Sequence, residues 1–294
     1  MRAVVLPVHD LNPLARRPWV TWVLIAINVA VFVLLEPVTG TIAGTARADV
    51  ASQADQLCEQ RYFFDRYAAV PRELLDGEQL AAGEPRVGPD AVAVRGDEVE
   101  CSRVAYAKNP PLSVLFSMFL HGGWLHLLGN MLFLLIFGNN VEDRMGRLRF
   151  LGFYLVCGYA AAYGFALLDR SETTLVGASG AIAGVLGAYL VIFPRARVVS
   201  LLTFFFFLPV RLPAWIVLGG WFLLQYLYFT GFGLASGSGG EAGGGVAYGA
   251  HVIGFAVGAL LVLPFVRRLR ARGPLPRSGR SGARASSRLR SRWG

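Results

Sequence analysis

The stretch VGASGAIAGVLGAY, residues 176–189, decides the fold, because it is an apolar run unusually rich in small residues. Small residues recur every fourth position in two neighbouring rows: Ser179, Ala183, Gly187 and Gly180, Gly184, Ala188. On a helix these rows form one smooth face that another backbone can approach closely. So much glycine disfavours a helix in water. Among the long apolar runs of this chain, the pattern predicts a membrane helix that packs tightly against its neighbours.

The one serine of this stretch is Ser179, which lies between Gly177 and Gly180. Gly177 loosens the backbone just ahead, so we expect Ser179 at the N-terminus of the helix. Free N–H groups and the positive end of the helix dipole favour a nearby anion there. A serine at this position is also an ordinary helix cap, and the stretch alone does not separate a cap from a nucleophile. The polar residues of the other helices bear on that choice.

The composition is that of a polytopic membrane protein. Of the 294 residues, 54% are hydrophobic and 16% are charged, and the mean hydropathy is +0.49. The net charge of +9 suggests nucleic-acid binding until its location is considered, because residues 267–294 hold ten arginines and no acid. We interpret them as a disordered cytoplasmic tail that orients the chain and touches anionic lipid, and we expect no nucleic-acid partner. The three cysteines lack the spacing of metal ligands, so neither a metal nor a cofactor is expected.

Six apolar segments alternate with charged turns. The polar interval 37–110 is acidic, with 12 acidic and 8 basic residues in 41–110, whereas arginines gather in alternate turns and in the tail. The positive-inside rule therefore places both termini in the cytoplasm and the long interval outside. We predict an all-α membrane protein with a cytoplasmic segment 1–18, a six-helix domain 19–266 that contains the 37–110 insertion, and the tail 267–294. The expected spans are 19–35, 123–139, 149–168, 178–193, 213–229 and 246–266.

Two further apolar segments are too short or too broken to cross the membrane. Residues 110–120 precede Gly122-Gly123, and we expect them to lie partly in the outer leaflet. Residues 201–210 form an aromatic apolar patch between prolines, which we place at the inner interface.

Polar side chains within the spans are costly, so each raises a functional question. In the second span, His126 and Asn130 lie four residues apart on one helix face, and His121 lies near the mouth of the helix. In the sixth span, His251 stands beside a small-residue stripe of Ala250, Gly254 and Gly258. Packing the smooth face of the fourth span on this stripe is expected to bring the Ser179 hydroxyl beside the His251 imidazole.

Such a pair suits nucleophilic catalysis. Serine needs a base to take its proton, and neutral histidine serves near pH 7. A tetrahedral oxyanion needs donors aimed at it, and the Ser179 N–H, the Asn130 amide and His126 are candidates. No acid lies near His251 in the sequence, so a dyad is favoured over a triad. Three acids at loop edges are weak candidates for a third member: Asp169, Glu172 and Glu241.

Metal-dependent alternatives fit less well. An amide oxygen is a poor zinc ligand beside His126 and His121. The HExxH pattern of a metalloprotease is absent from the sequence, and so is a pair of intramembrane aspartates.

The motifs together resemble those of the rhomboid family of intramembrane serine proteases. The matching pieces follow in order along the chain: His121-x4-His126-x3-Asn130, Glu142-Asp143-Arg144-x-Gly146, Gly177-Ala178-Ser179-Gly180 and Ala250-His251-x2-Gly254-x3-Gly258. The resemblance covers residues 110–266 and, by topology, the first helix. Each motif alone is unspecific, but all of them in register with six spans form a strong signal.

The resemblance implies cleavage of transmembrane protein substrates near their extracytoplasmic end, in a multi-pass protein of the cell membrane, of the bacterial plasma membrane type. It implies that Ser179 is the nucleophile and His251 the base. It also implies that His126, Asn130 and the Ser179 N–H line the oxyanion hole. The supporting residues would be His121, Gly177, Gly180 and Gly254. The fifth span, with Trp221, Phe222 and Gln225, would be the gate for substrate entry.

One departure from the family pattern concerns the base. Family members often carry an aromatic residue one turn after the serine, but Ala183 stands there, and Tyr189 or Tyr248 are possible substitutes. The long outer interval also carries Cys58 and Cys101, for which a disulfide and two free thiols stay open.

Two other functions stay open. A catalytically silent rhomboid-like protein would bind membrane clients without cleaving them. A transporter would use His126, Asn130 and His251 as an ion path and would be indifferent to Ser179→Ala.

Overall fold

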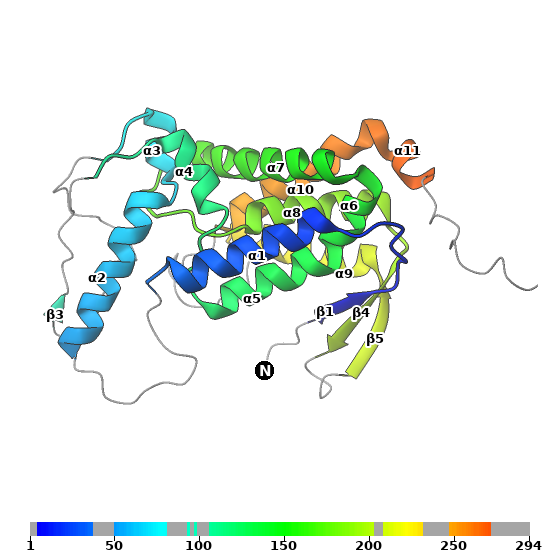
Figure 1. The fold of residues 1–294 in the computed structure, drawn as a ribbon, viewed down its shortest axis with the longest axis horizontal. Coiled ribbons are helices and arrows are strands. Elements are labelled where there is room, and N and C mark those ends of the chain that lie inside the picture. The colour runs from blue at the N-terminus through cyan, green and yellow to red at the C-terminus, as the bar shows by residue number, and fades with distance from the viewer. Residues whose placement is uncertain are drawn as a thin grey trace, which may run out of the picture.

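The computed structural model describes residues 5–37, 50–80, 93–94, 97–98, 106–202, 208–231 and 247–271. Helices dominate this part of the chain and lie roughly along one long axis (Figure 1). Cys101, Glu241, most of the predicted tail and most of the glycine-rich segment 231–245 lie outside the described residues.

Three described helical segments are long and apolar enough to cross a membrane: Trp124–Met145, Arg147–Leu168 and Tyr248–Leu269. The first joins α5 (Trp124–Phe133), a π-helical turn (Leu134–Gly138) and α6 (Asn139–Met145). The second is α7 (Arg147–Leu168), and the third joins α10 (Tyr248–Val262), a 3₁₀ turn (Leu263–Phe265) and α11 (Val266–Ala271).

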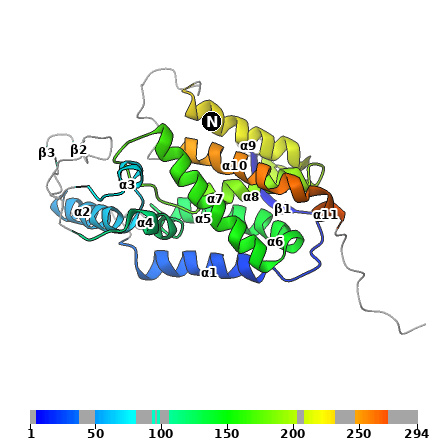
Figure 2. The ribbon, with the colours of Figure 1, turned by 90° about the horizontal axis from the view of Figure 1, so that it is seen from above.

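Three shorter apolar helices complete the bundle: α1 (Trp19–Leu34), α8 (Ser179–Ile192) and α9 (Ala214–Phe229). Seen from above, α1 and α9 lie at opposite edges of the bundle, with the other long helices between them (Figure 2). The fold is therefore that of a helical membrane protein.

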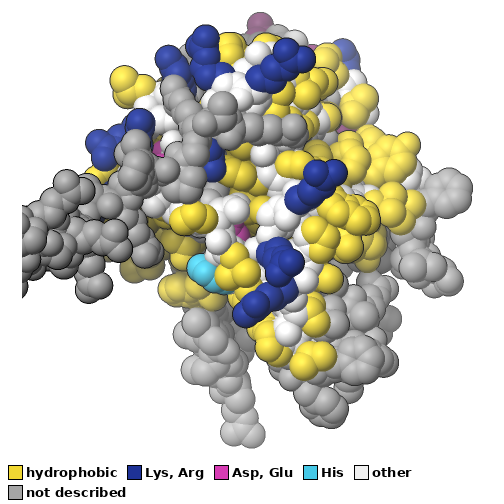
Figure 3. Space-filling view, turned by 90° about the vertical axis from the view of Figure 1, so that its right-hand side faces the viewer, with side chains coloured by type: hydrophobic (Ala, Val, Ile, Leu, Met, Phe, Trp, Pro, Cys, Tyr) yellow, Lys and Arg dark blue, Asp and Glu magenta, His cyan; other side chains and the backbone are white. Residues whose placement is uncertain are grey.

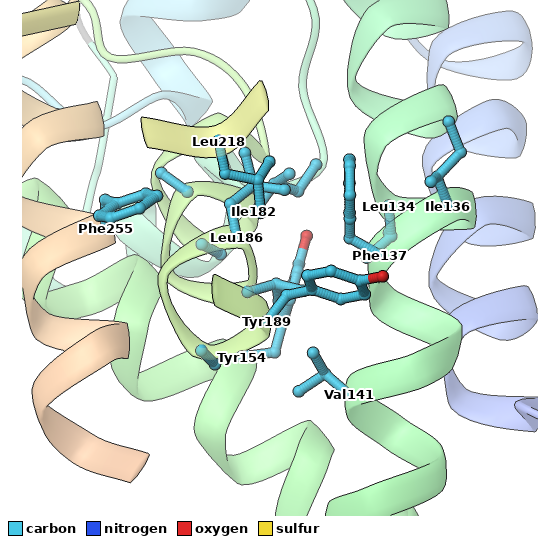
Figure 4. Close-up of a cluster of buried hydrophobic side chains, with 14 of the residues drawn as sticks. Leu134, Ile136, Phe137, Val141, Tyr154, Ile182, Leu186, Tyr189, Leu218 and Phe255 are labelled. Atoms are coloured by element: carbon cyan, nitrogen blue, oxygen red, sulfur yellow. The ribbon is translucent and has the colours of Figure 1, made fainter. Parts of the chain in front are cut away.

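The central helix of the bundle is α8, whose residues from Ala181 to Tyr189 are all buried. Its side chains Ile182, Leu186 and Tyr189 pack with Leu134 and Phe137 of the π-helical turn (Figure 4). Its small residues face α10 and α7, so the predicted role of the stretch 176–189 as the packing centre is confirmed.

A three-stranded antiparallel sheet lies at one end of the bundle, so the prediction of an all-α chain is wrong there (Figure 1). Its strands are ordered β1 (Val5–Asp10), β4 (Arg197–Leu202) and β5 (Leu208–Pro213). β4 pairs with β5 from Arg197↔Pro213 to Leu202↔Leu208. The segment RVVSLL of β4 is rich in Val and Leu, which suit a strand paired on both sides. A second, two-stranded pairing joins β2 (Ala93–Val94) and β3 (Asp97–Glu98).

A buried polar cluster ties the first strand to the C-terminal end of α8. The Tyr189 hydroxyl donates to the Asp10 carboxylate, and the Asn12 amide donates to the Tyr189 oxygen at 2.8 Å and to Asp10 at 2.9 Å. Burial raises the pKa of Asp10, and the hydrogen bonds to Tyr189 and its neighbours oppose that rise. The segment 1–18, expected as a simple cytoplasmic extension, is thus packed into the fold over residues 5–12.

The opposite end of the bundle carries a small helical cap formed by α2 (Val50–Tyr67), α3 (Pro71–Asp76) and α4 (Pro110–Ser117) (Figure 1). Ala69 forms an antiparallel bridge with Leu175, and the Arg72 guanidinium pairs with Glu172 at 2.6 Å. The cap therefore packs directly on the segment that leads into α8. Cys58 is disulfide-bonded, whereas Cys157 is free and buried.

The end that carries the sheet, α6 and α11 displays many Lys and Arg side chains among hydrophobic ones, and few acidic ones (Figure 3). The turns and strands at this end contribute several arginines, among them Arg147, Arg149, Arg197 and Arg211. Such a distribution is typical of the cytoplasmic face of a membrane protein.

Candidate active site

The nucleophile candidate Ser179 is the first residue of α8 and is half-buried. The preceding Gly177 has a φ of 119°, which L side chains rarely adopt, so glycine permits this turn. The Gly177 N–H donates to the Ser117 carbonyl oxygen at 2.9 Å, which fixes the loop to the end of α4. The hydroxyl of Ser179 is therefore presented at a helix N-terminus by a rigidly held turn.

The base candidate His251 lies in the first turn of α10, and its Nε2 is 2.7 Å from the Ser179 Oγ. Close packing of α8 and α10 produces this pairing. A Cβ on Gly254 would collide with the Gly180 carbonyl oxygen, and one on Gly258 with that of Gly184. Because glycines line the crossing of α8 and α10, the two backbones are in contact. Ser179 and His251 lie within one turn of these glycines and are therefore brought together.

The second ring nitrogen of His251 also has a partner. It is Gln225, which the family resemblance suggested only as part of the gate for substrate entry. The His251 Nδ1 is 2.7 Å from the Gln225 Oε1 on α9. Gln225 is the only amide or charged side chain in the apolar run of α9. A polar side chain in an apolar helix is costly, so this position could have been identified from the sequence as a candidate site residue.

The aromatic substitutes suggested for Ala183 fall in different places. The Tyr248 ring lies edge-on to His251 with centroids 6.3 Å apart, and the Trp221 ring lies 6.0 Å from it. Tyr189 is engaged with Asp10 at the other end of α8, so its suggested role beside His251 is wrong.

The candidate oxyanion donors gather beside the serine. A Cβ on Gly177 would lie 2.7 Å from the His126 ring and 3.5 Å from the Asn130 Nδ2, so the missing side chain makes room for both groups. The Asn130 Nδ2 lies 3.0 Å from the His121 Nε2 and donates one N–H to it. Since the amide has two N–H groups, the other is available to the space around Ser179.

His121 lies behind these groups and is fully buried. Its ring packs edge-on against His126, with centroids 5.2 Å apart. Its backbone N–H donates to both carboxylate oxygens of Glu36, each at 3.0 Å. Burial raises the pKa of Glu36 to about 7, against the lowering effect of that hydrogen bond. Glu36 lies beyond the end of α1, so this contact joins α1 to the loop ahead of α5.

A cavity of about 920 Å³ opens over the site. It is lined by polar groups from α5, α8, α9 and α10, namely His126, Asn130, Ser179, Gln225 and His251. Most of its other lining residues are apolar, and its size and mixed lining suit an extended peptide segment and the water that hydrolysis requires.

Two of the three weak acidic candidates, Asp169 and Glu172, have partners other than His251. The Asp169 Oδ1 accepts from the Ser171 N–H at 2.9 Å, and Glu172 pairs with Arg72. Glu241 lies outside the described residues. No group of three His, Cys, Asp or Glu side chains that could hold a metal occurs among the described residues.

The fold and the site together define a helical membrane protein with a serine–histidine pair in a cavity between its helices. Residues 109–268 match the model of the rhomboid domain, which is more than half of the chain. The chain belongs to the rhomboid family.

Curated relatives carry the same family name. RHOMBOID-like protein 5 of Arabidopsis thaliana is 40% identical over 25% of this chain and 24% of its own length. RHOMBOID-like protein 6, mitochondrial, of the same plant is 32% identical over 35% of this chain and 36% of its own length. The YdcA protein of Bacillus subtilis, also rhomboid-named, is 37% identical over 34% of this chain and 50% of its own length. The chain thus spans half or less of the length of these relatives.

Proposed function

We propose that this protein is an intramembrane serine endopeptidase that cleaves transmembrane segments of membrane-protein substrates near their extracytoplasmic end. The observation that carries the proposal is the 2.7 Å approach of the Ser179 Oγ to the His251 Nε2 inside a cavity between apolar helices, where further polar side chains gather. A structural serine cap needs no imidazole, and a structural histidine needs no open cavity. Membership of the rhomboid family, which includes intramembrane serine proteases, supports the same activity.

The steps follow from the geometry. The His251 Nε2 takes the Ser179 proton as the Oγ attacks the scissile carbonyl carbon. The resulting oxyanion receives N–H groups from the Ser179 backbone and the Asn130 amide, with His126 beside them. The imidazolium then gives its proton to the departing amine, which leaves an acyl-enzyme. Water from the cavity, deprotonated by His251, hydrolyses the ester and restores the serine.

The proposed topology has six crossings by α1, α5–α6, α7, α8, α9 and α10–α11, with both termini in the cytoplasm. The domain boundaries 1–18, 19–266 and 267–294 are proposed with it, and the insertion 37–110 lies outside. Support comes from the basic side chains at the sheet end (Figure 3) and from the position of the site at the end of α8 that lies next to α4 of the cap. The location proposed is a bacterial plasma membrane.

The central test uses Ser179→Ala and His251→Ala in detergent or liposomes with a test substrate that contains a transmembrane segment. Both variants are expected to abolish cleavage and to leave thermal stability near that of the wild type, since both side chains are half-buried beside a cavity. Labelling by a fluorophosphonate is expected to be lost in Ser179→Ala. A matched control, Ser200→Ala in β4, removes a hydroxyl that does not line the cavity and is expected to keep both substrate cleavage and fluorophosphonate labelling.

Cleavage that persists in Ser179→Ala would remove the serine from the mechanism. Full-length substrate bound but uncut by the wild type would favour a client-binding protein. Ion-coupled uptake unaffected by Ser179→Ala would favour a transporter.

A further inference from the structure

The two ring nitrogens of His251 are both engaged, and by partners of different chemistry. The Nε2 lies 2.7 Å from a serine hydroxyl, and the Nδ1 lies 2.7 Å from the amide oxygen of Gln225. An amide oxygen only accepts hydrogen bonds. The Nδ1 therefore carries the ring proton, and the Nε2 presents its lone pair to the Ser179 hydroxyl.

This is the tautomer that a general base requires, and the ring has two possible tautomers. Among the described residues no carboxylate is hydrogen-bonded to His251. The aromatic neighbours Trp221 and Tyr248 contact the ring at 6.0 and 6.3 Å between centroids, and such contacts do not distinguish the two nitrogens. Gln225 alone among these neighbours selects which nitrogen is protonated.

We propose that Gln225 is a positioning residue for the reaction proposed above, the third member of a Ser179–His251–Gln225 relay. Its Oε1 holds the ring in the orientation and tautomer in which the Nε2 accepts the serine proton. It also accepts a stronger hydrogen bond from the imidazolium that forms after proton transfer. A neutral amide does this without placing a second charge among apolar helices, where a carboxylate would be costly.

The Gln225 bond also crosses from one helix to another. The buried residues of α9 are Ala214, Val217 and Leu218, all in its first two turns, whereas Gln225 lies two turns further on. The hydrogen bond to His251 is thus a polar attachment of the less buried half of α9 to α10. This inference rests on the proposed function, because a base needs positioning only if it acts as one.

The test compares three substitutions at this position by kcat, KM and the pH dependence of kcat/KM for a substrate with a transmembrane segment. Gln225→Met keeps the length of the side chain and loses the acceptor, so kcat is expected to fall about tenfold, with KM near the wild-type value. Gln225→Glu keeps an acceptor and adds a negative charge that favours the imidazolium. The acid limb of the pH profile of kcat/KM for this variant is expected to move to higher pH by about one pH unit. The side chain of Gln225→Asn is one methylene shorter, and the kcat of this variant is expected to lie between those of the wild type and Gln225→Met.

The matched control is Leu223→Ala, which truncates an exposed side chain of the same helix and is expected to keep the wild-type rate and pH profile. A wild-type kcat in Gln225→Met, or an unmoved acid limb in Gln225→Glu, would overturn the role of Gln225. If Gln225→Met proves less stable to heat, the pH profile of the isosteric Gln225→Glu decides alone. Failure of the proposed function is separate, because it appears as cleavage that survives Ser179→Ala whatever stands at position 225.

Discussion

At the scale of single residues, the site consists of polar side chains that four otherwise apolar helices bring to one cavity. Ser179, His251, His126 and Asn130 are candidates because polar groups in apolar runs are costly and because their spacing puts them on common faces. The structure places these residues around one cavity. Gln225 could not be paired with His251 beforehand, because nothing in the sequence sets the rotation of α9 relative to α10. The hydrogen bond between Asn130 and His121 was equally inaccessible, since their nine-residue separation matches no helical repeat.

Substitution of Asn130 tests the oxyanion donors. Asn130→Ala is expected to lower kcat by up to about 100-fold without abolishing cleavage, because the Ser179 N–H stays in place. KM is expected to change little, since the oxyanion forms only after substrate has bound. The measurement is steady-state cleavage beside thermal unfolding, because the substitution also leaves the His121 Nε2 without its donor. Unchanged turnover in a stable variant would show that the Asn130 amide is not a donor to the oxyanion.

At the scale of elements, the small-residue rows of α8 and α10 are the reason that the site exists. Gly180, Gly184 and Gly187 each face backbone or a small side chain of a neighbouring helix. Larger residues at these positions would separate the helices and draw the Ser179 hydroxyl away from the His251 ring. The sequence could predict this contact, because residues 176–189 and the sixth predicted span both carry stripes of small residues, and two such faces allow the helix backbones to pack closely.

Substitution at the helix crossing tests this dependence. Gly258→Ala places a Cβ against the Gly184 backbone, where nothing can yield except the helices. We expect a loss of about 2 kcal/mol or more in stability, together with reduced cleavage. The matched control is Gly152→Ala in α7, where an added Cβ meets nothing within 4 Å. Alanine is the better helix former, so this control is expected to be neutral or slightly stabilising. Equal melting temperatures for the two variants in detergent would contradict the packing argument.

At the scale of the whole molecule, the helical bundle was predictable and the sheet was not. Long apolar runs and the charges between them predict helices in the membrane with little ambiguity. The strands β1 and β4 are about two hundred residues apart in sequence, and neither shows a regular alternation of polar and apolar residues. Their pairing depends on the bundle bringing them together.

Proton binding by the folded state offers a test of the whole assembly. The pKa of Glu36 rises from its ordinary value of 4.5 to about 7 in the folded protein. The protonated form therefore favours folding, and the stability that it contributes is complete below pH 4.5 and is lost as pH rises through 7. The change corresponds to about 3 kcal/mol. The melting temperature of the wild type minus that of a Glu36→Gln variant is expected to fall from about pH 5 to about pH 8.

Glu36→Gln keeps an acceptor for the His121 N–H and cannot ionise, so it lacks the contribution of Glu36 to the pH dependence and retains that of every other group. Glu59→Gln, at an exposed position of α2, serves as the control and is expected to follow the wild type. Parallel curves for Glu36→Gln and the wild type would show that another group dominates the pH response.

The strand at the beginning of the chain has a practical consequence. Because Asp10 and Asn12 satisfy the hydroxyl of Tyr189 near the C-terminal end of α8, a recombinant form that starts at residue 13 would leave that buried phenol without these partners and remove one edge strand from the sheet. Affinity handles are better fused ahead of residue 5 than in place of the residues after it. Trimming the opening residues as dispensable would weaken the same helix that carries the nucleophile at its far tip.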